Sequence, residues 1–175
     1  ALNNVSNLGF VPTMGSLHKG HLSLIKKSNE QCNKTIVSIF VNPTQFNKKD
    51  DFRKYPRNTK KDLSILRRNK INFLYMPKNN KIFKFKRTKK IQINKKNKVL
   101  CAKFRPGHFE GVLDVMDRLV RFIKPSKIYM GEKDLQQLIL VKNYLEKKYT
   151  SKIVSCRTIR SRKKLALSSR NILLK

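Results

Sequence analysis

Two histidines, His18 and His21, lie in a short loop that joins an apolar run to a helix-like segment. Imidazoles at such a junction can donate hydrogen bonds to phosphate oxygens and can stabilise charge that develops in a transition state. Gly15 and Gly20 allow the backbone to approach a phosphate closely, and the first N–H groups of the helix would face the same anion. The segment 14–21 is therefore a candidate phosphate-binding loop.

Other interpretations of this loop are possible. It resembles a Walker A loop in outline, but His21 and Leu22 stand where Lys and Ser/Thr are required, so a P-loop is rejected. A zinc site needs a third ligand, and His108 is the only other histidine, so no metal site is predicted. The plainer alternative is a pair of surface histidines, and the motif alone does not decide.

Three further polar clusters follow predicted strands. Gln45, in the segment 42–46, offers a donor and an acceptor for a small hydroxy acid. In the segment 131–134, Lys133 supplies a point charge for phosphate and Asp134 an acceptor for ribose hydroxyls. The segment 167–171 offers two hydroxyls and a guanidinium that could clamp a polyphosphate. Each cluster could equally be an ordinary turn, a capped helix end or a polar loop.

Strand and helix patterns alternate along the chain. Apolar or β-branched runs predict strands at 8–14, 35–41, 71–76, 127–130 and 153–156. Helices are predicted from Leu22 to about Gln31, after a cap at Asn58 or Thr59, over 111–123, and after a cap at Asp134. The helix over 111–123 is amphipathic, and its apolar side carries Val112, Val115, Met116, Leu119 and Phe122. The Lys-rich segment 78–98 is expected to form short exposed strands or a hairpin. The order predicts an α/β fold with a doubly wound, Rossmann-like, mostly parallel sheet, whose ligands lie at the carboxyl ends of the strands.

The composition limits the class of protein. The chain has 175 residues and a formal net charge of +32, from 42 Lys and Arg against 10 Asp and Glu. Such a surface attracts anions, so a nucleic-acid-binding protein is the first rival, although compositional drift explains the same excess. Three cysteines without C-x-x-C spacing favour free thiols in a reducing cytosol. The sequence shows neither a signal-peptide pattern nor a bilayer-length apolar run.

In their order and spacing, the clusters resemble the pantoate–β-alanine ligase family, the pantothenate synthetases, within the H-x-G-H nucleotidyltransferase superfamily. The matching stretches are Val11–Gly15 with His18–His21, Val37–Phe46, Tyr55–Arg57, Arg105–Phe109, Gly131–Gln137 and Leu165–Asn171. They span nearly the whole chain, so coincidence does not explain them.

The resemblance implies an ATP-dependent condensation of (R)-pantoate with β-alanine, through a pantoyl adenylate, with release of pyrophosphate and AMP. It implies that the catalytic residues are His21, His18 and Lys133, and that Gln45 and Gln137 bind pantoate, Gln45 also β-alanine. The implied ATP-binding residues are Met14, Gly15, Ser16, Leu17, His18, Lys19, Gly20, His21, Gly131, Glu132, Lys133, Asp134, Ile159, Leu167, Ser168, Ser169 and Arg170. It further implies Mg²⁺ accompanying ATP, a homodimer in the cytoplasm, and neither a specific nucleic acid nor a membrane as partner.

Two departures from the family pattern are visible. Lys163 and Lys164 fill positions where the family usually has Asp-Gly. The family also has a smaller C-terminal lid domain, so residues 1–171 are interpreted as the nucleotide-binding domain and residues 172–175 as the start of a truncated lid. A truncated or decayed ligase that binds ATP without efficient turnover is therefore a further alternative.

Overall fold

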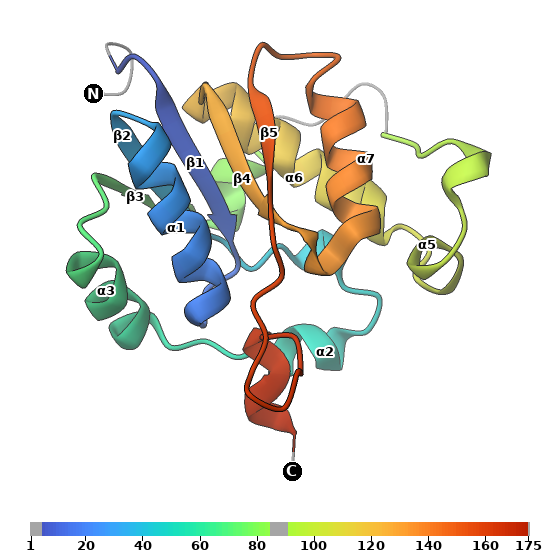
Figure 1. Ribbon diagram of the computed structural model, residues 1–175. Helices are drawn as coiled ribbons and strands as arrows, with labels where there is room; N and C mark the ends of the chain where they lie inside the picture. Colours follow the sequence, from blue (N-terminus) through green and yellow to red (C-terminus); the bar gives the residue numbers. More distant parts are fainter. Residues whose placement is uncertain (1–4, 85–90, 175) are drawn as a thin grey trace.

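A single parallel sheet organises the chain (Figure 1). The computed structural model describes residues 5–84 and 91–174. Its strands are β1 (Leu8–Thr13), β2 (Lys34–Ile39), β3 (Phe73–Tyr75), β4 (Lys127–Gly131) and β5 (Lys152–Cys156). They lie in the order β3-β2-β1-β4-β5, and each pair of neighbouring strands is parallel. All five carboxyl ends therefore meet at one edge of the sheet.

Helices cover both faces of the sheet (Figure 1). One face carries α1 (Lys19–Gln31) and α3 (Thr59–Arg68), and the other carries α6 (His108–Ile123) and α7 (Leu135–Leu145). The shorter elements are α2 (Lys49–Lys54), α4 (Asn79–Ile82), α5 (Cys101–Phe104) and the 3₁₀ turns η1 (Pro43–Gln45), η2 (Lys95–Asn97), η3 (Glu132–Asp134) and η4 (Ser169–Leu173). The predicted doubly wound α/β fold is confirmed.

Each face of the sheet has its own apolar core. On the α1 face, Ile25 and Leu66 pack with Val37. On the α6 face, buried residues from the strands and helices form the larger cluster, which includes Phe10, Ile36, Ile128, Met116, Leu119, Leu138 and Val141. Burial of one such side chain contributes about 1.5 to 3 kcal/mol, so these residues hold the strand ends in place.

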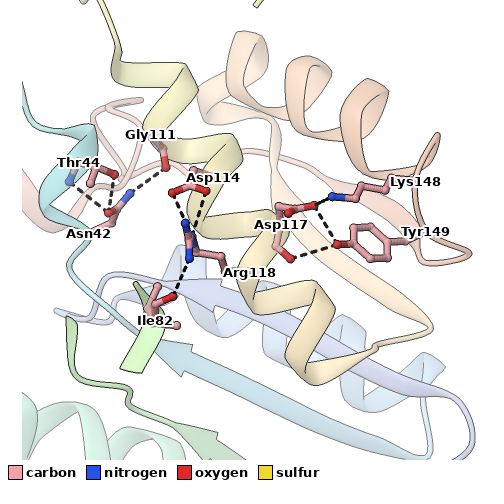
Figure 2. Close-up of polar contacts among 9 residues, drawn as sticks. All are labelled: Asn42, Thr44, Ile82, Gly111, Asp114, Asp117, Arg118, Lys148 and Tyr149. Atoms are coloured by element: carbon pink, nitrogen blue, oxygen red, sulfur yellow. Dashed lines mark hydrogen bonds and ion pairs between the residues drawn. The ribbon is translucent and has the colours of Figure 1, made fainter. Parts of the chain in front are cut away.

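Polar contacts fix α6 along its length (Figure 2). Arg118 donates through Nε to both Asp114 oxygens, at 3.0 and 3.1 Å, and through a terminal nitrogen to the carbonyl of Ile82. The buried Asp117 of the same helix accepts hydrogen bonds from Lys148 Nζ at 2.7 Å and from the Tyr149 hydroxyl at 2.9 Å. These contacts tie α6 to the segments on either side of it.

Three element predictions need correction. No strand forms in the described parts of 78–98; α4 and η2 stand there instead, because Ile82 and Ile93 are buried as separate anchors on the α6 face. Residues 85–90 lie outside the described ranges. Phe122 is 60% exposed and stacks on Tyr75, with ring centroids 4.9 Å apart, instead of entering the core. The Asp134 side chain does not cap α7, because it pairs with Lys133.

Two helices begin earlier than the sequence predicts, and one predicted helix cap is confirmed. The helix predicted from Leu22 begins at Lys19, because His18 acts as its N-cap. The helix predicted from Gly111 begins at His108. The predicted cap at Asn58 is confirmed, since its side chain accepts from the Lys61 N–H. The periodic apolar pattern located each helix, and side-chain caps mark where α1 and α3 start.

Candidate functional site

A cavity of about 240 Å³ opens at the carboxyl ends of the strands. β1 and β4 are neighbours, but the chain leaves β1 towards β2 and β4 towards β5. This is the topological switch point at which open α/β sheets bind ligands. Of the predicted site residues, the cavity is lined by Met14, His18, Gly20, His21, Gln45, Gly131, Lys133, Asp134, Gln137, Ile159, Leu167, Ser168, Ser169 and Arg170.

Five predicted residues do not line the cavity: Gly15, Ser16, Leu17, Lys19 and Glu132. Leu17 is buried in the α1-face core, where it anchors the loop. The Glu132 carboxylate accepts a hydrogen bond from the Ser155 hydroxyl at 2.6 Å. The segments 14–21 and 131–134 therefore each contain residues that line the cavity and residues that do not.

The two histidines form the N-terminal cap of α1. His18 Nδ1 accepts from the Gly20 N–H at 3.1 Å, and His21 Nδ1 accepts from the His18 N–H at 3.3 Å. A nitrogen that accepts a hydrogen bond carries no proton, so the proton of each neutral ring lies on Nε2. The ring centroids are 4.1 Å apart. The capping contacts thus leave both Nε2–H groups as donors for a ligand.

Both imidazoles are held in the neutral form. Burial, then the neighbouring His18 and Lys133, lowers the pKa of His21 from 6.5 to about 3. Burial and Lys133 also lower the pKa of His18. Neutral imidazoles can donate to phosphate oxygens at physiological pH without adding a second charge beside Lys133.

The loop after β4 contributes a cation. Lys133 lies on η3 and its ammonium is 3.0 Å from an Asp134 carboxylate oxygen. The side chains of this pair are 35% and 61% exposed. Such a pair is weak in water, so an anionic ligand can compete with Asp134 for the ammonium.

Gln45 is fixed by three neighbours. Its side-chain nitrogen approaches Met14 Sδ at 3.0 Å, its side-chain oxygen accepts from Asn42, and its carbonyl contacts His108 Nδ1 at 2.6 Å. Burial lowers the pKa of His108, so its neutral ring donates from Nδ1 to this carbonyl. A rigidly placed amide is suited to orienting a small polar substrate.

Asn42 connects this turn to α6 (Figure 2). It donates to the Gly111 carbonyl at 3.0 Å and accepts from the Thr44 N–H and hydroxyl. A Cβ at Gly111 would lie 2.5 Å from the Thr44 carbonyl oxygen. Glycine is therefore required at position 111 for η1 to pack on α6 and present Gln45 to the cavity.

The polar residues of η4 have partners within the protein. The Ser168 hydroxyl accepts from the Arg170 N–H, and the Ser169 hydroxyl contacts the carbonyls of Gly15 and Ser16. The Arg170 guanidinium donates to both oxygens of Asp51 at 3.0 Å. These bonds use one terminal nitrogen of Arg170, so the other guanidinium N–H groups can still donate to a phosphate.

The wall of the cavity towards α6 is apolar. Val112, Val115, Met116 and Leu119 line it together with Ser38 of β2. The Ser38 hydroxyl is buried and has no hydrogen-bond partner among the described residues. A branched hydrocarbon group would bury apolar surface against these side chains.

Sequence reasoning missed several residues of this region. Tyr55 is buried and lines the cavity, and Arg157 and Thr158 line it after β5. Asp62 was also missed: it is 2% exposed and accepts from the N–H groups of Ser16 and Leu17. A polar residue at the core-facing position of a helix was the one available signal, because a buried carboxylate needs partners.

The departure at 163–164 falls in a small exposed hairpin. Arg160 and Ala166 form an antiparallel bridge, and Lys164 between them has φ +61°. Left-handed backbone of this kind suits glycine. The hairpin leads from Ile159 to Leu167, which are joined by a hydrogen bond of 2.9 Å.

A doubly wound α/β domain with hydrogen-bond donors and a cation at its switch point has the architecture of nucleotide-binding domains. The chain belongs to the pantoate-beta-alanine ligase family, whose model matches residues 1–175. The pantothenate synthetase of Legionella pneumophila (strain Corby) is 42% identical over 166 residues, covering 94% of this chain and 66% of that protein. That of Clostridium botulinum (strain ATCC 19397 / Type A) is 43% identical over 169 residues, covering 96% and 60%.

Solved structures of this family have the same fold. The pantoate-beta-alanine ligase of Francisella tularensis, complexed with beta-gamma ATP and beta-alanine, matches with a TM-score of 0.95 and 41% identity. The match covers 99% of this chain and 69% of that one. The pantothenate synthetase of Thermus thermophilus matches with a TM-score of 0.92 and 35% identity, covering 97% and 62%. The chain spans 60 to 66% of the length of the curated relatives it matches.

Proposed function

We propose that the chain carries the ATP-dependent ligase site that joins (R)-pantoate to β-alanine to form pantothenate. One observation carries the proposal: two neutral imidazoles with free Nε2–H donors and the Lys133 ammonium line one cavity at the switch point. The ATP and beta-alanine in the Francisella tularensis relative support the same substrates here. The comparisons do not favour the nucleic-acid-binding alternative.

The proposed assignments follow the lining of the cavity. His18, His21 and Lys133 would contact the phosphates, and Asp134 the ribose. The backbone around Gly131 and Ile159 and the segment 167–170, which leads into η4, would complete the nucleotide site. Met14 and Gly20 would lie against the nucleotide, whereas Gly15–Leu17, Lys19 and Glu132 would act by shaping or surrounding the site. Gln45 and Gln137 would bind pantoate, Gln45 also β-alanine, with the apolar wall receiving the branched carbons of pantoate.

Two steps account for the reaction. A pantoate carboxylate oxygen attacks the α-phosphorus of ATP, the bond to the β-phosphate bridging oxygen breaks, and pyrophosphate leaves. The β-alanine nitrogen then attacks the acyl carbon, the bond to AMP breaks, and the nitrogen loses a proton. The Nε2–H donors of His18 and His21 and the ammonium of Lys133 stabilise the added negative charge on phosphate. Positioning supplies most of the remaining acceleration.

Mg²⁺ would arrive with the nucleotide. The described residues contain no group of three acidic, histidine or cysteine side chains that could hold a metal ion. Among the described residues that line the cavity, Asp134 is the one carboxylate, and it faces Lys133. This donor set does not fit a protein-held metal, but it fits an ion coordinated mainly by phosphate oxygens and water.

We also propose three properties from the family resemblance. A homodimer, a cytoplasmic location and the division into residues 1–171 and a lid that starts at 172 are expected from the family resemblance. Sedimentation of the purified chain would test the dimer. None of the helices in residues 5–84 and 91–174 has the length and apolarity that a membrane span requires.

The test is the formation of AMP from ATP in the presence and absence of each co-substrate. We expect AMP release to require both pantoate and β-alanine, and His21→Ala to lower kcat by about 10²- to 10³-fold, as loss of a transition-state donor does. Lys26→Ala is the matched control, because Lys26 is an exposed residue of the same helix. AMP release that ignores pantoate, or that survives unchanged in His21→Ala, would contradict the assignment. Binding of ATP without turnover would favour the decayed-ligase alternative.

A further inference from the structure

The backbone just before the two histidines has an unusual conformation. Gly15 has φ +81° and Ser16 has φ +50°. Such angles are unfavourable for a residue other than glycine and persist only where surrounding contacts enforce them. Something must therefore hold the loop in this shape before any ligand binds.

Asp62 makes the contacts that hold it. Its Oδ2 accepts from the Ser16 N–H at 2.8 Å and its Oδ1 from the Leu17 N–H at 2.7 Å. Both oxygens are used, and the side chain is buried on the inner side of α3. Two successive N–H groups that converge on one carboxylate form the kind of concavity that proteins otherwise offer to an anion. In this loop, a carboxylate of the same chain fills that place.

The surroundings of Asp62 suit a side chain with two acceptor oxygens. Asp62 lies in the first turn of α3, where the helix dipole stabilises negative charge. A Cβ at Gly15 would lie 3.0 Å from Asp62 Oδ2, so glycine permits the close approach. The carbonyl oxygens of the same two peptide groups belong to Gly15 and Ser16. The Ser169 hydroxyl contacts them at 3.3 and 3.0 Å. The segment is thus held from two sides by residues distant in sequence.

The held segment leads directly into the imidazoles. Leu17 immediately precedes His18, whose backbone N–H in turn orients His21 through Nδ1. Asp62 itself is not among the residues that line the cavity of the candidate site. Its effect on chemistry must pass through the loop.

We propose that Asp62 is a positioning residue that locks the 14–21 loop so that His18 and His21 present their Nε2–H groups to the cavity. Its effect on turnover rests on the proposed ligase function. A second consequence is that the Ser16 and Leu17 N–H groups are not available to phosphate. The triphosphate must then be held by the imidazoles, the start of α1 and Lys133, and not by the loop backbone.

The experiment compares wild type, Asp62→Ala and Asp62→Asn, with Asn58→Ala as the matched control. Asn58 caps the same helix through the Lys61 N–H, away from the two loop amides. Amide hydrogen exchange at Ser16 and Leu17 and the ¹⁵N shifts of labelled histidine are read without any substrate. We expect exchange at both amides to accelerate at least about tenfold in Asp62→Ala, as local opening predicts, and the Nε2–H tautomer to be lost. Asp62→Asn should protect one amide, because it keeps one acceptor oxygen, and Asn58→Ala should leave both amides and both rings unchanged.

Kinetics then links the loop to turnover. In Asp62→Ala we expect kcat for AMP formation to fall about 10²-fold with a smaller change in KM, because the misplaced donors act mainly in the transition state. Asp62→Asn should recover part of this loss. Unchanged exchange and tautomers in both Asp62 variants would overturn the proposal. If exchange and tautomers change as expected but wild type forms no AMP, the positioning role stands and the ligase function fails.

Discussion

The loops after β1 and β4 face the same cavity but are built differently. After β1, Asp62 and Ser169 hold the backbone, Leu17 is buried, and the two histidines cap α1 with their own rings. After β4, η3 is exposed, its Asp134 side chain caps no helix, and a Cβ at Gly131 would meet no atom within 4 Å. One loop is fixed by buried contacts, and the other is shaped by solvent-exposed charges.

Because the loops after β1 and β4 are held differently, we expect them to contribute differently to catalysis and to ligand binding. Neutral donors are useful only when they are aimed, because a neutral hydrogen bond depends steeply on geometry. An ammonium attracts a phosphate over a longer distance and tolerates imprecise placement, but its attraction is sensitive to salt. We therefore expect His18 and His21 to determine the rate of the chemical step, and Lys133 to contribute a larger share of nucleotide capture.

Among the tests of this comparison, the largest change in kcat/KM for ATP should come from Lys133→Met, which removes the cation and keeps a side chain of similar length. We expect kcat/KM for ATP to fall about 10²-fold at low salt, because a partly exposed cation beside a triphosphate is lost. The measurement is steady-state AMP formation between about 50 and 300 mM salt, a range in which the Debye length shortens to below about 8 Å.

The salt series distinguishes the two loops. The wild-type rate should fall with salt, and the slope should be shallower in Lys133→Met but unchanged in His21→Ala. Equal slopes in all three proteins would show that the β4 loop does not act through long-range charge, and the comparison between the loops would then be wrong.

The second effect, of intermediate size, is a loss of folding stability as the pH falls. His21 has a folded pKa of about 3 against 6.5 for the free side chain, so the unfolded chain binds more protons between these values. The stability that depends on a neutral His21 is complete above pH 6.5 and is lost as the pH falls below it. Between about pH 6.5 and 5 the loss attributable to His21 should be about 1 to 2 kcal/mol.

Urea unfolding of wild type and His21→Gln at several pH values measures this loss. Carboxylates titrate in both proteins, so the difference between the two curves isolates the histidine. A wild-type protein that loses no more stability than His21→Gln on acidification would show that the ring is not held neutral by the fold.

The smallest effect concerns the exposed hairpin that leads to η4. Lys164 has φ +61°, whereas Lys163 is not among the described residues with positive φ. Lys164→Gly should raise the free energy of unfolding by up to about 1 kcal/mol, because the left-handed cost disappears. Lys163→Gly should lower it by about 0.5 to 1 kcal/mol, because glycine there only adds freedom to the unfolded chain.

Thermal unfolding of the two single variants gives the comparison. Opposite signs would confirm the conformational account. Destabilisation by both substitutions would mean that the left-handed backbone at Lys164 carries no strain, unlike that at Ser16, which Asp62 has to hold.

Local sequence patterns were enough to predict the order of the elements and the edge of the sheet at which the candidate site lies. The apolar runs that became β1, β2 and β4 are continuous because both of their faces are buried, and polar clusters follow directly after them. Parallel pairing brings all carboxyl ends to one edge, so residues as distant as His18, Gln45 and Lys133 line one cavity. In the described parts of 78–98 the predicted strands do not form, because Ile82 and Ile93 are buried as separate anchors and not as one face of a strand.

Only the tertiary structure decided which atoms of the site are available to a ligand. Asp62 lies 45 residues from Leu17 and Ser169 lies 153 residues from Ser16, and no periodic pattern connects them. No periodic pattern connects Asp51 with Arg170 either, although Arg170 donates a hydrogen bond to it. A sequence specifies hydrophobic periodicity residue by residue, but the partner of a buried polar group is whichever group the packed elements bring within about 3 Å. The chemistry expected of the loop was therefore visible in its residues, and its own capping contacts fix the histidine tautomers. The partners of its backbone N–H and carbonyl groups, in contrast, come from α3 and η4.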